Sequence, residues 1–434
     1  DAPSIHVVAD AKGEVSINCR ALGEALRGCE ITWRVSDASG TTVAETTSAV
    51  GDSAELHAAI SIQNPNLWDV DDPYLYTAEG TLSCDGEIVD VVSVRFGVRS
   101  AEFRPHEGFF LNGRRLQLRG CNRHESMPGF GRALPLWLHS EDAKRIKSMG
   151  LNFVRLSHYP QHPAFLDACD ELGILVFAEV ASWKSVRGGR WLKRACRQMH
   201  DMIVRDRNHP SVILWGMGNE GRHRGAYEKL YALCKSLDPD RAVTYAENHL
   251  HRARRKRTLG LPDVWGTNYE FDAMEAGCEA SRLKCVVVSE CSNYPHTERG
   301  VPDAEEIQLK TIQDDVSEID KYPYAAGFTL WCYNDYATLR KQRYKRYSGI
   351  VDAWRTPKRS ARWLAGEFGG ALVSETPPCT GGGGVVSSII LTPERDHLNA
   401  SERDTMGIRV SVLCAEGQCR GWQGVLRAVV EGPA

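Results

Sequence analysis

Two apolar stretches of the chain each end near a glutamate, and this pairing indicates acid–base chemistry on a sugar. The stretch Val212–Gly216 leads to Asn219 and Glu220, and the stretch Cys285–Ser289 leads directly to Glu290. Hydrolysis of a glycosidic bond needs one carboxyl group that gives a proton to the leaving oxygen and one carboxylate that attacks the sugar or activates water. We therefore take Glu220 as the candidate acid/base and Glu290 as the candidate nucleophile.

A barrel of parallel strands would bring the two glutamates together. Eight apolar strand candidates alternate with amphipathic helices between residues 116 and 330, which is the size and period of a (β/α)8 TIM barrel. A doubly wound sheet is the competing topology, but no Gly-rich phosphate loop follows the first strand. The strand candidates are Leu116–Gly120, Asn152–Leu156, Ile174–Ala178, Val212–Gly216, Ala242–Tyr245, Val264–Thr267, Cys285–Ser289 and Ala326–Leu330.

Helix boundary signals support this alternation. Ser140 is placed to cap a helix over Glu141–Met149, and Gly150 is placed to end it. Asp238, followed by proline, is placed to end a helix that runs through Tyr227 to Leu237.

Polar and aromatic side chains follow the predicted strand ends, where a barrel of this kind carries its functional groups. Glu290 would be kept ionised by donors such as Arg155 and Tyr269. Each of these residues has a structural alternative: a histidine can be hydrogen-bonded in a core, a tryptophan can be core, and a glutamate can sit at a helix N-terminus. The side chains near these strand ends that are compatible with a sugar ligand are His124, Arg155, His158, Asn219, Tyr269, Asn293 and Trp331.

The flanking segments predict further domains. Residues 1–102 alternate apolar and polar residues in short strands, which indicates an immunoglobulin-like β-sandwich before the barrel domain at 103–371. Residues 372–384 contain a glycine run typical of a linker. Residues 385–434 predict a partial C-terminal β-sandwich, with strand candidates at 387–391, 407–413 and 424–430. The abrupt start and the short final domain lead us to expect that flanking sequence is missing.

Composition limits the partners and the compartment. A net charge of −3 gives no general attraction to nucleic acid or to an anionic membrane, and no apolar run is long enough to cross a bilayer. The first residues lack the pattern of a signal peptide, so we expect a cytoplasmic protein. The 14 cysteines are scattered without CxxC pairs, which favours reduced thiols over a disulfide framework or a zinc site, with a Cys414–Cys419 bridge left open. We expect no cofactor, and a homo-oligomer is compatible with the sequence.

From about Asn64 to Phe368 the chain resembles glycoside hydrolase family 2, which holds β-galactosidases, β-glucuronidases and β-mannosidases. The resemblance rests on the motifs NPNLWDVDDPYLY, RFGVRS, LNGRRLQLRGCNRHES, GLNFVRLSHYPQHPAFLDACDELGILVFAEV, RDRNHPSVILWGMGNE and VVVSE. It implies a retaining double displacement with Glu220 as acid/base and Glu290 as nucleophile, at the carboxyl separation of ~5–5.5 Å that retention requires. It also implies substrate contacts for His124, Arg155, His158, Asn219, Tyr269 and Trp331, and a sandwich before the barrel.

Two departures from the family pattern change the expectation. The best-known β-galactosidases place metal-binding acidic and histidine residues after the third strand, whereas this chain has Glu179-Val-Ala-Ser-Trp-Lys184, so we expect no metal site. The jelly-roll domain that usually precedes the sandwich is not seen in this sequence. If that domain supplies part of the sugar pocket, this chain alone would bind sugar weakly.

The identity of the sugar depends on two basic runs, His251–Arg257 and Arg340–Arg346, which follow the fifth and eighth strands. They could bind a uronic acid carboxylate, with Arg343 and Arg346 as the candidates, or they could be solvated loops. The Asn-x-Lys signature of β-glucuronidases is replaced by Arg346-Tyr-Ser, and the pattern LWCYNDYATL with YSGIVDAWRTPK looks closer to bacterial β-galactosidase-like members.

We therefore expect a retaining exo-β-glycosidase, most like a β-galactosidase, that acts on oligosaccharides or glycoconjugates. The first alternative is a hydrolase of β-glucuronides or β-galacturonides. The second is a catalytically inactive carbohydrate-binding protein, which would have little reason to keep both Glu220 and Glu290.

Overall fold

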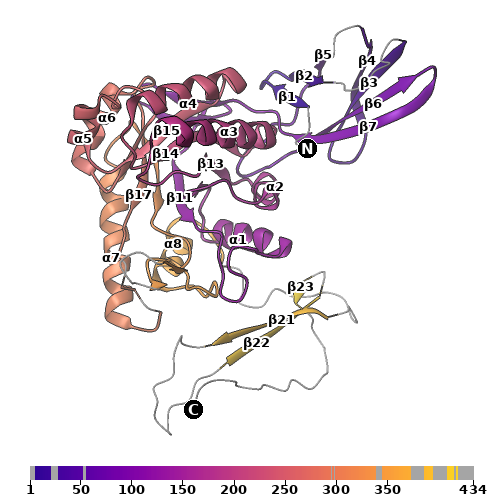
Figure 1. The fold of residues 1–434 in the computed structure, drawn as a ribbon. Helices are drawn as coiled ribbons and strands as arrows, with labels where there is room; N and C mark the ends of the chain where they lie inside the picture. The colour runs from indigo at the N-terminus through magenta and orange to yellow at the C-terminus, as the bar shows by residue number, and fades with distance from the viewer. Residues whose placement is uncertain are drawn as a thin grey trace.

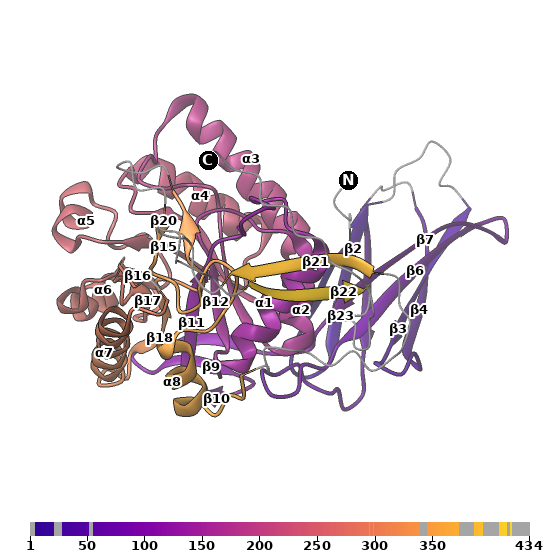
Figure 2. The same ribbon diagram turned by 90° about the horizontal axis from the view of Figure 1, so that it is seen from below.

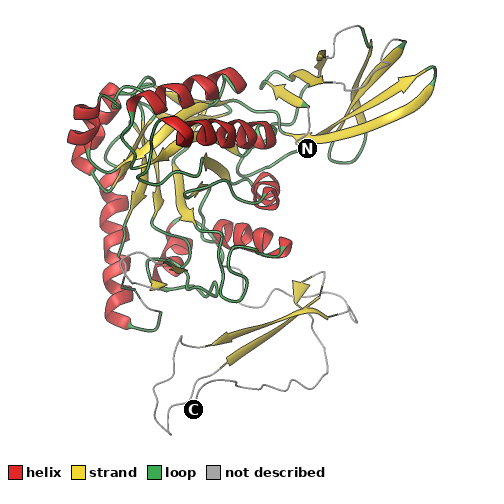
Figure 3. Ribbon diagram, viewed as in Figure 1, coloured by secondary structure: helices red, strands yellow, loops and turns green. Residues whose placement is uncertain are grey.

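The computed structural model of the protein shows a β-sandwich, a helix-wrapped barrel and a small C-terminal sheet (Figures 1 and 3). No helix in the part of the chain that the structure describes has the length and apolarity needed to span a bilayer. The described residues are 5–20, 28–51, 55–294, 296–297, 299–338, 345–372, 386–393, 408–414 and 417–418.

The N-terminal sandwich consists of two antiparallel sheets, in the strand orders β1-β2-β5 and β4-β3-β6-β7. Alternation along β3 buries Ile31, Trp33 and Val35 against the other sheet while their neighbours face outward. The predicted immunoglobulin-like sandwich is therefore confirmed. Its strands are β1 (His6–Ala9), β2 (Glu14–Arg20), β3 (Cys29–Ser36), β4 (Thr42–Ala49), β5 (Glu55–Ser61), β6 (Tyr76–Cys84) and β7 (Glu87–Phe96).

One cysteine pair departs from the predicted preference for reduced thiols. Cys29 on β3 and Cys84 on β6 form a disulfide, because antiparallel pairing of the two strands sets them directly opposite each other. Their separation of 55 residues gives no local spacing signal in the sequence. Among the described cysteines, nine are free, and eight of these are buried.

Eight parallel strands close into a barrel, and each of the eight predicted strands is one of them. Several strands run further toward their C-terminal ends than hydropathy predicts, so polar residues such as Arg123 and Glu247 still belong to the sheet. The barrel strands are β11 (Leu118–Arg123), β12 (Phe153–Leu156), β13 (Leu175–Glu179), β14 (Val212–Asn219), β15 (Ala242–Glu247), β16 (Trp265–Asn268), β17 (Val286–Cys291) and β18 (Ala325–Leu330).

Helices surround the barrel, as the view from below shows (Figure 2). The helix over residues 136–148 begins after Pro135, so Ser140 lies inside it and the predicted Ser140 cap is wrong. The end of α4 at Asp238 is as predicted. The helices are α1 (Leu136–Ser148), α2 (Pro163–Leu172), α3 (Gly189–Asp206), α4 (Arg224–Leu237), α5 (Leu250–Lys256), the 3-10 turn η1 (Phe271–Ala273), α6 (Met274–Ala280), α7 (Pro302–Ile319) and α8 (Arg359–Glu367).

A small sheet closes the N-terminal end of the barrel. It comprises β8 (Ala101–Arg104), β9 (Gly108–Leu111) and β10 (Arg114–Arg115), and Asn112 and Gly113 form a tight turn with positive φ. Phe109 and Leu111 pack against the strand starts in one apolar cluster. Because this end is filled, the opposite, C-terminal end is where a site can open.

The sandwich is attached to the barrel through side chains that bond barrel backbone. Trp68 Nε1 donates to the carbonyl of Asp170 at 2.8 Å, and Arg99 Nε donates to the carbonyl of Pro210 at 2.6 Å. Trp68 is fully buried, so this contact is part of the core rather than a surface association.

The C-terminal segment forms an antiparallel sheet of β21 (Val386–Pro393), β22 (Ile408–Cys414) and β23 (Gly417–Gln418). These strands overlap two of the three predicted there. The third predicted strand, at 424–430, and the possible bridge to Cys419 lie outside the described residues, as does the glycine run of the predicted linker.

A buried ion network joins the first and last barrel strands. Asp142 on α1 accepts from Arg123, at the end of β11, at 2.7 Å and from Arg355, beyond β18, at 2.7 Å, and all three side chains are almost completely buried. Burial alone would raise the pKa of Asp142, but Arg355 and Arg123 outweigh it and lower the pKa to about 2.

This network gives a pH-dependent stability test. Because the folded pKa of Asp142 lies below the unfolded value of about 3.9, its contribution is complete above about pH 5 and is lost progressively as the pH falls toward 2. Asp142→Asn should lower the free energy of unfolding by about 3 kcal/mol at pH 7, because two buried guanidinium groups lose their counter-charge. Urea titrations should show that the difference in free energy of unfolding between wild type and Asp142→Asn becomes smaller between pH 5 and pH 3.

The control is Asp314→Asn, which removes an exposed ion pair with Lys310 and should change stability by less than about 1 kcal/mol. A gap between wild type and Asp142→Asn that stays constant down to pH 3 would contradict the assignment.

Candidate active site

A cavity of about 720 Å³ opens at the C-terminal mouth of the barrel. Eight predicted site residues line it, whereas Arg155 and Asn219 are buried outside its lining and Arg343 lies outside the described residues. The lining residues are His124, Ser126, Arg132, His158, Tyr159, Trp183, Glu220, Tyr269, Glu290, Asn293, Trp331, Tyr336, Ala337, Thr338 and Arg346.

The backbone is strained where the strands reach this mouth. Lys184, Glu220 and Tyr269 have φ values of 60°, 51° and 60°, a region that non-glycine residues rarely occupy and that costs on the order of 1 kcal/mol or more each. Each backbone N–H is held by a carbonyl of a neighbouring strand or its loop, as for Glu220, which donates to Ala246 at 2.7 Å. The sheet therefore sets these side chains at fixed positions.

Arg155, at the end of β12, is the centre of the site's hydrogen bonds. Its guanidinium is completely buried and donates to Glu179 at 2.6 Å, to Asn219 Oδ1 at 2.8 Å and to Glu290 Oε1 at 3.0 Å. Burial opposes the charge of Arg155, but Glu179 and Glu290 outweigh it and raise its pKa. Burial likewise acts to raise the pKa of Glu179, yet Arg155 and His158 bring it below its ordinary value.

Glu290, on β17, is held through both carboxylate oxygens. Oε1 accepts from Arg155, and Oε2 accepts from the hydroxyl of Tyr269 at 2.7 Å. Burial and the Glu290 carboxylate raise the pKa of Tyr269 well above its ordinary value, so the phenol keeps its proton and remains a donor. His158 Nε2 lies 3.8 Å from the same carboxylate.

Glu220, directly after β14, has different partners. Its Oε2 lies 2.8 Å from the ammonium of Lys184, and its Oε1 is 3.4 Å from the amide nitrogen of Asn268. Asn268 ends β16 and Tyr269 follows it directly, so one short segment at the end of this strand contacts both glutamates. This segment keeps the two carboxyl groups at the same cavity.

Asn219, the residue before Glu220, lies under the cavity rather than in its lining. Its Oδ1 accepts from Arg155 and from Asn268, and its Nδ2 has no hydrogen-bond partner among the residues that the structure describes. A buried amide donor without a partner is costly, and it is suited to bond a ligand oxygen.

The aromatic side chains form one wall. Trp331 is 6% exposed, and its ring stacks on His158 at 5.2 Å between centroids, so that ring face is covered by protein. His124 packs against Tyr336 at 4.3 Å, and burial, with His158 and Arg132 nearby, lowers the pKa of His124 well below its ordinary value. His124 is therefore neutral near pH 7.

The basic runs have different positions. His251–Arg257 forms part of α5 and its end, and none of its residues lines the cavity, so this run fits the solvated alternative. Arg346 lines the cavity and donates to Asn293 Oδ1 at 3.1 Å. Arg132, which the sequence analysis did not select, supplies a second lining cation.

Sequence reasoning also missed Trp183 and Lys184. It treated this segment only as a departure from a metal-binding pattern, whereas the structure places the Lys184 ammonium at Glu220 and Trp183 in the lining. The available signal was position, because both residues follow the third predicted strand.

Comparisons with known proteins agree with this architecture. The family described as "Glycosyl hydrolases family 2, TIM barrel domain" matches residues 104–368, and the one described as "Glycosyl hydrolases family 2" matches residues 3–99. The chain belongs to glycosyl hydrolases family 2.

Relatives within the family carry two different names. A β-galactosidase of Thermoanaerobacter pseudethanolicus is 30% identical over 82% of this chain and 48% of its own length, and one of Thermoanaerobacterium thermosulfurigenes is 33% identical over 69% of this chain and 43% of its own. The crystal structure of a Parabacteroides merdae β-glucuronidase superposes with a TM-score of 0.74 at 26% identity, covering 86% of this chain and 52% of that one. This family 2 chain thus spans about half the length of the relatives it matches.

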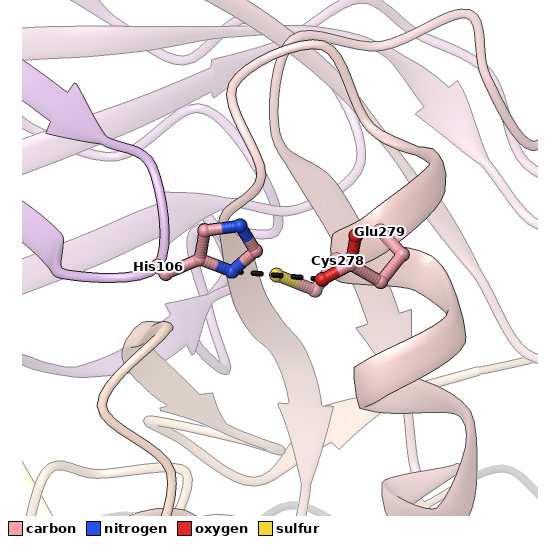
Figure 4. A group of neighbouring side chains, drawn as sticks. All are labelled: His106, Cys278 and Glu279. Atoms are coloured by element: carbon pink, nitrogen blue, oxygen red, sulfur yellow. Dashed lines mark ion pairs between the residues drawn. The ribbon is translucent and has the colours of Figure 1, made fainter.

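Among the residues that the structure describes, three side-chain groups outside the cavity lining have the composition of metal ligands: His106 with Cys278 and Glu279, His249 with His251 and Glu270, and Asp167 with Asp170 and His209. In the first (Figure 4), His106 pairs with Glu279 at 3.6 Å. The Cys278 thiol donates to the carbonyl of Lys284, and burial raises the pKa of Cys278 to about 12. A thiol that keeps its proton is a poor metal ligand.

Arg155 gives a second stability test. Arg155→Met should lower the free energy of unfolding by about 3–5 kcal/mol, because Glu179 and Glu290 would be left as uncompensated buried charges. The double variant Arg155→Met/Glu179→Met should recover part of this loss, which a double-mutant cycle by urea unfolding would measure.

The control is Arg104→Met, whose exposed pair with Glu102 should contribute less than about 1 kcal/mol. If Arg155→Met costs no more than this control, Arg155 does not hold the site together.

Proposed function

We propose that the protein hydrolyses terminal β-glycosides by a retaining double displacement, with Glu290 as nucleophile and Glu220 as acid/base. The observation that supports this most is the different environment of two carboxyl groups that line one cavity. Glu290 accepts from Arg155 at 3.0 Å and from Tyr269 at 2.7 Å, whereas Glu220 is contacted by the Lys184 ammonium at 2.8 Å and by one long amide contact at 3.4 Å.

In the first step Glu290 attacks the anomeric carbon while Glu220, in its protonated form, gives its proton to the departing glycosidic oxygen. The bond to the leaving group breaks as the bond to Glu290 forms. In the second step Glu220 takes a proton from water, the water oxygen attacks the anomeric carbon, and Glu290 leaves as a carboxylate. Arg155 and Tyr269 offer the departing carboxylate the same hydrogen bonds throughout.

The same observations weigh against a purely carbohydrate-binding role. A binding protein needs hydrogen-bonding groups but not two carboxyl groups that line one cavity with different partners. The orphan Nδ2 of buried Asn219, next to Glu220, further suits a bond to a sugar hydroxyl.

We take β-galactosides as the first substrate to test, since the motifs after the eighth strand look β-galactosidase-like and relatives named β-galactosidase match most of the chain. A β-uronide is the second candidate, and Arg346 is the observation that favours it. Its guanidinium lines the cavity, where it could bind a carboxylate.

Replacing each carboxyl group should have a distinct effect. Glu290→Gly should lower kcat by about 10³-fold or more on every substrate, because no covalent intermediate can form. Glu220→Ala should lower the rate on alkyl glycosides by about 10²–10⁴-fold but much less on dinitrophenyl glycosides, whose leaving groups need no proton. Analysis of the products formed with added azide should show the α-glycosyl azide from Glu290→Gly and the β-glycosyl azide from Glu220→Ala.

Glu228→Ala, on the exposed face of α4, is the control for expression and folding. Full activity of Glu290→Gly, or the same azide product from both variants, would exclude these roles.

A panel of nitrophenyl β-galactoside, β-glucuronide, β-galacturonide and β-mannoside should separate the two substrates. If a uronide is turned over, Arg346→Met should raise its KM by about ten- to a hundredfold through loss of a charge-assisted hydrogen bond, with a much smaller effect on a neutral sugar. Arg254→Met, in the exposed basic run, is the matched control. Equal effects of Arg346→Met on charged and neutral sugars would argue against a carboxylate contact.

A further inference from the structure

The side of the cavity opposite Asn293 and Arg346 carries an exposed aromatic ring. Trp183, after β13, is 42% exposed and lines the cavity, whereas Trp331 on the other wall is 6% exposed. Contact between an exposed tryptophan ring and a flat apolar ligand face removes apolar surface from water, which favours binding. The function proposed above assigns no role to this ring.

The backbone fixes Trp183 beside the candidate acid/base. Trp183 pairs with Asn219 as an isolated parallel bridge, in which Asn219 N–H donates to the carbonyl of Ser182 at 3.2 Å and Lys184 N–H donates to the carbonyl of Asn219 at 2.8 Å. The Lys184 ammonium lies 5.0 Å from the centroid of the Trp183 ring and 2.8 Å from Glu220. The ring, the ammonium and the carboxylate thus form one continuous surface.

The order of strands places this surface across the mouth from Asn293 and Arg346. In the closed ring β11 to β18, β13 is four strands from β17 and so lies opposite it. Asn293, which follows β17, and Arg346, which follows β18 and bonds Asn293, therefore face Trp183 across the cavity.

We propose that Trp183 is the platform of a leaving-group subsite and that it selects β-glycosides whose leaving group has a flat apolar face, an aromatic ring or a pyranose ring. The proposal rests on the function proposed above, because an acid/base gives its proton to the glycosidic oxygen and a group next to it faces the leaving group. Trp183 is a binding residue in this account, and Lys184 places the Glu220 carboxylate beside it.

The test compares benzyl and methyl β-glycosides of the sugar that the nitrophenyl panel identifies. The two alcohols have similar acidity, so the chemical demand on Glu220 is matched and only the ring differs. Wild type should have a higher kcat/KM for the benzyl glycoside than for the methyl glycoside. Trp183→Ala should lower kcat/KM for the benzyl glycoside by about tenfold and should change kcat/KM for the methyl glycoside by less than about twofold. Trp183→Phe should keep most of the preference, and disaccharides of the same sugar should follow the benzyl glycoside if pyranose faces also stack.

Phe130→Ala removes another exposed aromatic ring that does not line the cavity, and it should leave both glycosides unchanged. Equal losses on benzyl and methyl glycosides in Trp183→Ala would mean that Trp183 only supports the Asn219 backbone, and no loss on either would remove the platform. Both results overturn this proposal while hydrolysis by wild type still stands. Absence of turnover of every glycoside by wild type would instead refute the proposed function.

Discussion

The site depends on one buried guanidinium. Arg155 ties together carboxylates from β13 and β17 and an amide from β14, and in a low-dielectric interior each of these contacts strengthens the others. Three strands that are separate along the chain are thereby held in one arrangement. Glu290 receives its position directly from Arg155, and Glu220 receives its position through Asn219, the residue before it. Removal of one partner would leave a buried charge without its counter-charge, which is destabilising, so these residues are energetically coupled.

The N-terminal end of the barrel is part of the packed core, and the C-terminal end carries the candidate active site. The N-terminal end is filled by Phe109, Leu111 and the strand starts, which form one apolar cluster. The C-terminal end carries the polar groups of the site. The backbone is left-handed there at Glu220 and Tyr269, a strained conformation that a well-packed sheet can maintain. Catalysis by two carboxyl groups needs such fixed positions, because small displacements of the reacting groups cost large factors in rate.

The sequence was a good guide to whatever has a local signal. Apolar runs predicted all eight barrel strands, and position after those runs predicted eight of the residues that line the cavity. The sequence could not predict how far below the cavity a side chain lies. Arg155 and Asn219 are near strand ends like the other site residues, yet they lie beneath the cavity, where they contact Glu179 and Asn268. Pairings across strands were invisible for the same reason, which explains why the Cys29–Cys84 bond and the contact of Lys184 with Glu220 were missed. The run at 251–257 shows the converse, since charge density alone does not say which way a helix faces.

The central claim is that Glu290, held by Arg155 and Tyr269, forms a covalent bond to the sugar. Incubation of the full chain with a 2-deoxy-2-fluoro glycosyl fluoride of the accepted sugar, followed by peptide mass spectrometry, tests it most directly. The account predicts one added glycosyl group, on the peptide that contains Glu290, and no label in Glu290→Gly. A label on any other residue, or an unlabelled protein that still hydrolyses the corresponding glycoside, would contradict it.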